Sequence, residues 1–246
     1  MRKHLSVFML MARSSVYKLL LVMLGMAAAE IALVALVAEA KTLLLFNLVE
    51  SSRIYYVYIV AVALTVIFSL GACSMGSSHP RYTLARLSVS YKVVMLWHWL
   101  YSALALLALW MWQAILLYGI SLWHHSVAEA GYISHQSIFL SSFQSNFFHS
   151  VLPLEDFSRL MRNIVMALAM GGVCATGAHK IRRGQTGIFA AILLIGIFGV
   201  SFRAEHFAIN NDGFLMFAFA LVLVISLYGV FAGDAEVDHE ETATEN

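Results

Sequence analysis

The sequence predicts an all-α membrane protein with six transmembrane helices, and composition and hydropathy are the main observations behind this prediction. Hydrophobic residues make up 61% of the 246 residues and charged residues 12%, against about 45–50% and about 25% in typical soluble domains. The mean hydropathy of +0.81 means that most helices must face lipid or one another. Two prolines and fifteen glycines leave little room for a β-rich or disordered architecture.

Six hydrophobic runs are long enough, or nearly so, to form the roughly 20-residue helix that crosses a hydrocarbon core. The fourth run carries Arg159 and Arg162 in its first turns, and we expect their long side chains to reach the interface and mark the end of the span. The fifth run is short. The predicted spans are Leu19–Val37, Tyr55–Met75, Val93–Ile120, Phe157–Gly177, Gly187–Phe202 and Phe214–Ala232.

The basic residues predict that both termini lie on the cytosolic side. With the N-terminus inside, ten Lys and Arg residues fall on cytosolic segments and five on outer segments, as the positive-inside rule requires. Residues 1–233 then form a single transmembrane domain. Residues 234–246 carry six acidic side chains and predict a disordered cytosolic tail.

The N-terminal residues predict a short amphipathic helix on the inner membrane surface. Apolar side chains recur there at helical spacing between basic ones. The alternative is a basic tail that only fixes the topology. The apolar residues are Leu5, Phe8, Met9, Ala12 and Val16.

Glu30 is an ionisable residue inside the first predicted span, with apolar neighbours on both sides. Because an ionisable group in a membrane is costly, it is a functional-site hypothesis by default: Glu30 could bind a proton or a cationic group of a substrate. The structural alternative is a protonated side chain, or one hydrogen-bonded to a neighbouring helix. The sequence leaves both open.

Histidine and cysteine offer weaker hypotheses. Paired membrane histidines can ligate haem iron, and His98 and His179 are predicted at similar depth. His98 is flanked by tryptophans, however, and this favours an interface position with a water or carbonyl partner. Cys73 and Cys174 lie in predicted spans and form no CxxC pair. We therefore expect no cofactor, metal or catalytic residue, and no nucleic-acid partner, because topology accounts for the few basic residues.

The segment Ser121–Asp156 predicts a long outer connection with helical content. Phe139, Phe143 and Phe147 are spaced four residues apart, which places an aromatic stripe on one side of a helix. We expect Pro153 to end that helix and Asp156 to cap the fourth span, with Glu155 and Arg159 forming a supporting pair. The segment could serve as a gate or vestibule, or as a packed lid.

The polar insert Ser77–Lys92, reading SSHPRYTLARLSVSYK, predicts a short cytosolic helix between the second and third spans. Ser77 or Ser78 can cap it, with Pro80 in its first turn. Leu84, Leu87 and Tyr91 then share one side, which leaves Arg81 and Arg86 for solvent or an acidic partner. The alternative is an ordinary positive loop that fixes topology.

These features together resemble the ABC-2 family of ABC transporter permeases. The stretches YTLARLSVSYKVVMLWHWLY (Tyr82–Tyr101) and FFHSVLPLEDFSRLMRN (Phe147–Asn163) are similar to small permeases of this type from Gram-positive bacteria. One departure is that family members usually carry their large outer elements between spans five and six, where Arg203–Gly213 is short. The likeness covers most of the chain but contains no catalytic motif.

The resemblance implies a permease subunit in a bacterial plasma membrane, working with a second permease subunit as a homodimer or heterodimer. A separately encoded ATP-binding cassette subunit would dock on Tyr82–Ser90, since this chain has no GxxxxGK[ST] loop. The coupling residues would be Tyr82, Leu84, Arg86, Leu87 and Tyr91. The expected function is ATP-driven export of a hydrophobic or amphipathic substrate. The alternatives are a non-transporting membrane sensor or assembly partner, and a b-type haem protein.

Overall fold

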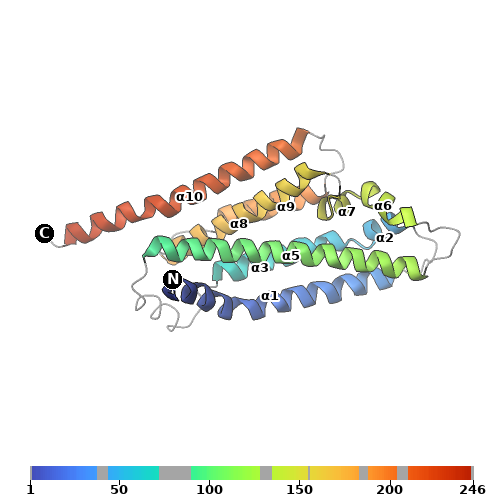
Figure 1. Cartoon of the computed structure of the whole chain (residues 1–246), viewed down its shortest axis with the longest axis horizontal. Helices are drawn as coiled ribbons and strands as arrows, with labels where there is room; N and C mark the ends of the chain where they lie inside the picture. The colour runs from blue at the N-terminus through green and yellow to red at the C-terminus, as the bar shows by residue number, and fades with distance from the viewer. Residues whose placement is uncertain are drawn as a thin grey trace.

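The computed structural model describes residues 2–37, 44–71, 90–127, 135–154, 156–182, 188–203 and 210–244, and all regular structure within these ranges is α-helical. The longer helices run along a common direction, and three short helices gather at one end of the bundle (Figure 1). α1 begins and α10 ends at the opposite end. The longer helices are α1 (Arg2–Val37), α3 (Ile54–Gly71), α5 (Tyr91–Val127), α8 (Phe157–Arg182), α9 (Phe189–Arg203) and α10 (Asn210–Thr244), and the short ones are α2 (Leu45–Ser51), α6 (His135–Gln144) and α7 (Asn146–Val151).

Five of the described helices are long and apolar enough to cross a membrane. The apolar part of α9, Phe189–Phe202, is shorter. With 15 residues and a rise of about 1.5 Å per residue, α9 extends about 22 Å, against about 30 Å for a hydrocarbon core. The all-helical membrane fold is therefore confirmed for the described residues, whereas the sixth span and the orientation stay predictions. The five spans are Ser15–Val37, Ile54–Gly71, Lys92–Val127, Phe157–Ile181 and Asp212–Gly229.

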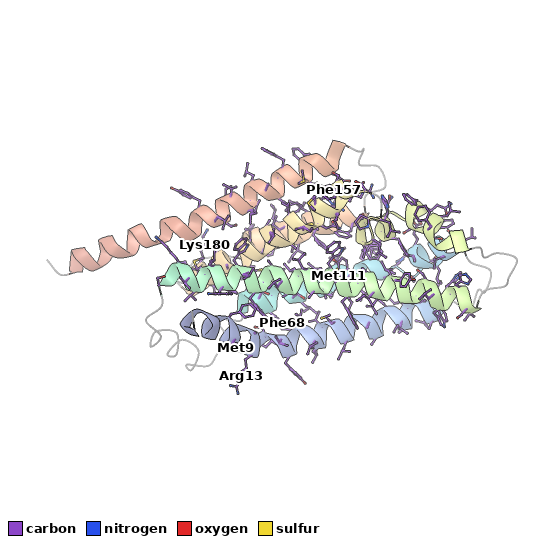
Figure 2. The ribbon with its side chains drawn as sticks, in the orientation of Figure 1. Met9, Arg13, Phe68, Met111, Phe157 and Lys180 are labelled. Carbon is purple, nitrogen blue, oxygen red and sulfur yellow. The ribbon has the colours of Figure 1, made fainter. Side chains whose placement is uncertain are left out.

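α1 is one continuous helix from Arg2 to Val37, in which the candidate membrane span begins at Ser15; a position of its first turns on the membrane surface stays a prediction. No glycine or proline occurs before Gly25, and nothing local therefore ends the helix. The Phe8 ring packs 5.5 Å from that of Trp97 on α5. Met9 and Arg13 at this end of α1 stay exposed (Figure 2).

α10 continues as a helix to Thr244, in place of the disordered tail expected over 234–246. The physical reason is that extending an existing helix needs no new nucleus. Alanine and glutamate, which recur in this segment, are also good helix formers.

α5 forms side-chain hydrogen bonds to four other helices. Its polar side chains contact backbone carbonyls on α1, α3, α7 and α8. His98 Nε2 lies 2.9 Å from the Ser69 carbonyl on α3, so of the two partners expected for this histidine, a water or a carbonyl, the structure shows a carbonyl. Three indole N–H groups donate in the same way: Trp99 to Leu168 (2.8 Å), Trp110 to Val151 (3.0 Å) and Trp112 to Met23 (3.0 Å).

Two adjacent glycines let α8 approach α5 and α10 closely. A Cβ placed on Gly171 would lie 2.8 Å from the Ala103 backbone nitrogen on α5, and one on Gly172 would lie 2.9 Å from the Ser226 Cβ on α10. Small residues at helix contacts are the usual basis of close packing in membranes. Gly171 and Gly172 thus fix α8 between its two neighbours.

The aromatic stripe predicted for a single helix is divided between two. α6 ends at Gln144, and Ser145 starts α7 by accepting a hydrogen bond from the Phe148 N–H at 3.4 Å. Phe139 and Phe143 stay on α6 with partly exposed rings 4.9 Å apart. Phe147 moves to α7, where it is buried, because the helix changes direction at the Ser145 cap.

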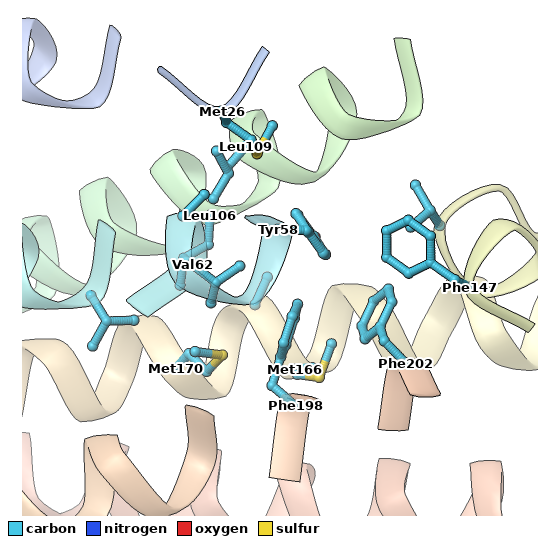
Figure 3. Close-up of a cluster of buried hydrophobic side chains, with 14 of the residues drawn as sticks. Met26, Tyr58, Val62, Leu106, Leu109, Phe147, Met166, Met170, Phe198 and Phe202 are labelled. Atoms are coloured by element: carbon cyan, nitrogen blue, oxygen red, sulfur yellow. The ribbon is translucent and has the colours of Figure 1, made fainter. Parts of the chain in front are cut away.

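Buried Phe147 packs against an aromatic cluster under the short helices. The Tyr58 ring on α3 lies 6.0 Å from Phe147, 5.5 Å from Phe198 and 5.6 Å from Phe202 (Figure 3). The cluster joins α3, α7 and α9. It forms the apolar base on which the charged residues at this end of the bundle rest.

Candidate functional site

A cluster of four charged side chains joins the N-terminal ends of α8 and α10. Arg159 and Arg162, one turn apart on α8, both pair with Asp212. Arg162 Nη1 lies 2.5 Å from Asp212 Oδ1, and Arg159 Nε lies 3.1 Å from Asp212 Oδ2. Arg159 Nε also lies 3.2 Å from Asp156 Oδ2. Two positive and two negative groups leave the cluster without net charge.

Arg162 is the buried member, with 3% of its side chain exposed. Its Nε and Nη2 donate to Asn163 Oδ1 at 3.4 and 3.2 Å, and its guanidinium carbon lies 5.7 Å over the Phe202 ring. Asn163 in turn donates to the Ser150 carbonyl of α7 at 2.7 Å. A buried cation needs this combination of an opposite charge and hydrogen bonds. The network ties α7, α8 and α10 together.

Two of the predictions for this region differ in outcome. Asp156 caps α8 as predicted, since its Oδ1 accepts from the backbone N–H groups of Ser158 (3.1 Å) and Arg159 (3.4 Å). The Arg162 side chain, which was expected to extend toward the interface, is buried within the protein and paired with Asp212. The expected partner of Arg159, Glu155, lies outside the described residues. Sequence reasoning missed Asp212, and its only local signal was an acidic residue at the start of an apolar run.

A cavity of about 460 Å³ opens beside this cluster, between α7, α8, α9 and α10. Its polar wall includes Asn146, Arg159 and Asp212, and its apolar wall includes Ile197 of α9 and Leu215 of α10. The volume falls in the range of about 300–1,000 Å³ that is usual for small-molecule sites. An arrangement of this kind suits a ligand with a polar group at one end and an apolar body.

A smaller cavity of about 320 Å³ lies on the other side of Asn146, between α2, α3, α7 and α9. Glu50 and Arg53 line it together with Tyr56, and Asn146 belongs to both linings. Arg53 has a positive φ of 53°, the left-handed conformation that joins α2 to α3. The short helices thus form two neighbouring hollows at the same end of the bundle.

His149 on α7 stands beside the charged cluster. Burial lowers its pKa below the ordinary value of histidine, and the positive charges of Arg159 and Arg162 act in the same direction. Asp156 and Asp212 oppose the shift without cancelling it. The ring is therefore neutral near pH 7 and would add a positive charge beside the arginines only in acid.

Glu30 is completely buried between α1 and α5. The Gln113 amide nitrogen donates to Glu30 Oε2 at 3.2 Å, which is the interhelical hydrogen bond that the structural interpretation of Glu30 predicts. Glu30 Oε1 and Gln113 Oε1 have no hydrogen-bond partner among the described residues. Glu30 does not line either of the two cavities, and a substrate role for it stays a prediction.

Most of the predicted coupling segment lies outside the described residues. Tyr82, Leu84, Arg86 and Leu87 belong to this part of the chain, and Tyr91 is described only as the first residue of α5. The segment nevertheless has a fixed place in the chain, because it connects the end of α3 with the start of α5. Within the described part, no group of three or more His, Cys, Asp or Glu residues could hold a metal ion.

The fold defines the class as an all-helical, multi-pass membrane protein. Comparison of the sequence with protein-family models and with curated proteins gives no match, and neither does comparison of the fold with solved structures.

Proposed function

We propose that this chain is a permease subunit of an ATP-driven ABC transporter of the ABC-2 type, which exports an amphipathic substrate from a bacterial cell. The observation that carries the transport proposal is the cavity of about 460 Å³ beside the Arg159–Arg162–Asp212 cluster. A charged wall facing an apolar wall is the chemistry that an amphipathic molecule needs. The charged wall would bind the polar group of such a molecule and the apolar wall its apolar body while the molecule leaves one leaflet.

The position of α5 supports coupling between this cavity and the opposite end of the bundle. α5 starts directly after the proposed docking segment Tyr82–Ser90 and has 37 residues, a length of about 55 Å. Its far half donates a hydrogen bond from Trp110 to Val151 on α7, next to Ser150 in the cavity wall. A displacement of the N-terminal end of α5 by a docked partner would therefore be transmitted along α5 to the cavity wall.

The free energy for transport would come from a partner. This chain contains no phosphate-binding loop of the GxxxxGK[ST] type, so ATP would be bound by a separate cassette subunit docked on Leu84 and Leu87. A second permease subunit would complete the path. The exposed apolar surfaces of α1 and α10, including Leu24 and Val224, are suited either to lipid or to such a subunit.

The test is co-purification of the chain from its native membrane, followed by reconstitution with the ATP-binding subunit that accompanies it. The double variant Leu84→Asp/Leu87→Asp should retain the ATPase activity of the partner but lose ATP-dependent flux, because the apolar docking face carries charge. Ser77→Asp/Ser78→Asp, in the same connection but outside Tyr82–Ser90, is the control and should keep flux, because Asp is as good a helix cap as Ser. Normal flux in the folded Leu84→Asp/Leu87→Asp variant would refute the docking site. Partner binding with no ATP-dependent flux in the wild type would favour the sensor or assembly role.

A further inference from the structure

We infer that the cavity between α8, α9 and α10 takes an amphiphile whose headgroup carries an anionic phosphate or carboxylate oxygen, and that Arg159 holds this headgroup. The inference rests on the proposed function and deepens it by naming the substrate class. It comes from counting which hydrogen-bonding groups in the cavity wall already have partners and which do not.

The carboxylates of the cluster are already paired with arginines. Asp212 contacts Arg162 through Oδ1 and Arg159 through Oδ2, so a cationic headgroup approaching either oxygen would be repelled by a guanidinium already beside it. Asp156 accepts two backbone N–H groups at its Oδ1 and Arg159 at its Oδ2. Both carboxylates of the cluster thus have an arginine partner, and a positively charged ligand would meet the positive charge of that arginine beside each of them.

The donors of Arg159 are only partly occupied. Both of its carboxylate contacts involve Nε, and its two Nη groups have no partner among the described residues. A guanidinium has five N–H donors in a fixed fork, and four of those of Arg159, on its two Nη groups, contact no described residue. This fork matches two oxygens of a phosphate or carboxylate. Arg162 differs, since all three of its nitrogens are engaged by Asp212 and Asn163.

Exposure separates the two arginines in the same way. The Arg159 side chain is 23% exposed and lines the cavity, whereas Arg162 is 3% exposed. Arg159 can thus reach a ligand without leaving its carboxylates. Because the cluster has no net charge, we expect the selectivity to come from the guanidinium fork and not from a long-range positive field.

The opposite wall explains why the ligand needs an apolar body. Leu193 and Val200 of α9 and Phe214 of α10 line the cavity and are also more than half exposed, so the apolar wall continues onto the surface that would face lipid. An alkyl chain can follow this surface out of the cavity. At Gly196, also in the wall, an added Cβ would meet no atom of the described chain within 4 Å.

Gly196 therefore offers a way to fill the cavity without straining the helix, and Gly25 on α1 offers a matched control. A Cβ on Gly25 likewise meets no described atom within 4 Å, and Gly25 is not part of the cavity wall. Gly196→Leu places a side chain in the space that the ligand would occupy. Gly25→Leu places the same side chain on an outer helix face.

The experiment measures binding to the purified full-length chain in dodecyl maltoside, a detergent without phosphate or carboxylate. The probes are dodecyl phosphate, dodecanoate, dodecanol and dodecyltrimethylammonium, which differ in the headgroup, together with inorganic phosphate, which lacks the tail. We expect dodecyl phosphate and dodecanoate to bind about tenfold or more tightly than dodecanol, as charge-assisted hydrogen bonds predict. Inorganic phosphate should bind more weakly than dodecyl phosphate, since it buries no apolar surface.

The variants decide the site. Arg159→Gln should reduce the affinity for dodecyl phosphate to about that for dodecanol, and Gly196→Leu should weaken both probes, whereas Gly25→Leu should change neither. Circular dichroism and size-exclusion chromatography check that each variant is folded. If Arg159→Gln does not fold, the binding measured with Gly196→Leu tests the site by itself.

Three results would overturn the inference: equal or tighter binding of dodecyltrimethylammonium, undiminished anion preference in folded Arg159→Gln, or undiminished binding in Gly196→Leu. Headgroup selectivity without any ATP-driven flux would overturn the proposed function alone. Flux without headgroup selectivity would overturn this inference alone.

Discussion

Removing Asp212 should destabilise the protein chiefly through the arginine that it leaves buried. Loss of one partner of a buried ion pair typically costs about 3–5 kcal/mol. Arg162 is 3% exposed and would keep only its neutral hydrogen bonds to Asn163. Arg159 is more exposed and would keep Asp156, so its share is about 0–1 kcal/mol. We therefore expect Asp212→Ala to lower the free energy of unfolding by about 3–6 kcal/mol.

The assay is reversible unfolding in mixed micelles of dodecyl maltoside and dodecyl sulfate, followed by circular dichroism. A double-mutant cycle isolates the pair: Arg162→Met should cost less than Asp212→Ala, because Asp212 retains Arg159, and the combined variant should recover about 2 kcal/mol of the summed losses. The reasoning is wrong if Asp212→Ala costs less than about 1 kcal/mol, or if the two substitutions are additive.

Two further predictions concern helix packing and pH. Gly171→Ala should destabilise the protein by about 1–3 kcal/mol, because its Cβ would lie 2.8 Å from the Ala103 nitrogen. The control Gly25→Ala should be neutral or stabilising by up to about 1 kcal/mol, because no described atom lies within 4 Å of its Cβ. Equal effects of the two substitutions in the same unfolding assay would contradict the packing argument. The lowered pKa of His149 means that the unfolded chain binds its proton more readily, so its contribution to stability is complete above about pH 6.5 and is lost as the pH falls below that value. Unfolding measured between pH 7.5 and 5 (roughly the range in which an ordinary histidine titrates) should show a smaller loss in His149→Gln than in the wild type, and parallel curves would refute this assignment.

Local chemistry made some features of the site predictable. The Asp156 cap follows from an acidic residue just before an apolar run, whereas the tryptophan neighbours of His98 left open whether its partner is a water or a carbonyl. The split of the aromatic stripe was harder to foresee, because Phe139, Phe143 and Phe147 have ideal spacing for one helix. Ser145 ends the first helix because its side chain caps a second one. The spacing of the aromatic residues alone does not predict whether the first helix continues or a capped second helix begins.

The sequence by itself determined that this is a helical membrane protein, since hydropathy is a sum over neighbouring residues and needs no knowledge of the fold. Only the tertiary structure decided that Arg159 and Arg162 meet Asp212, some 50 residues away, and that a cavity opens beside them. The physical reason is that lipid satisfies any apolar face equally well. Which faces of α8, α9 and α10 meet is therefore set by close contacts such as Gly172 against Ser226 and by the pairing of buried charges, and both depend on partners distant in the chain.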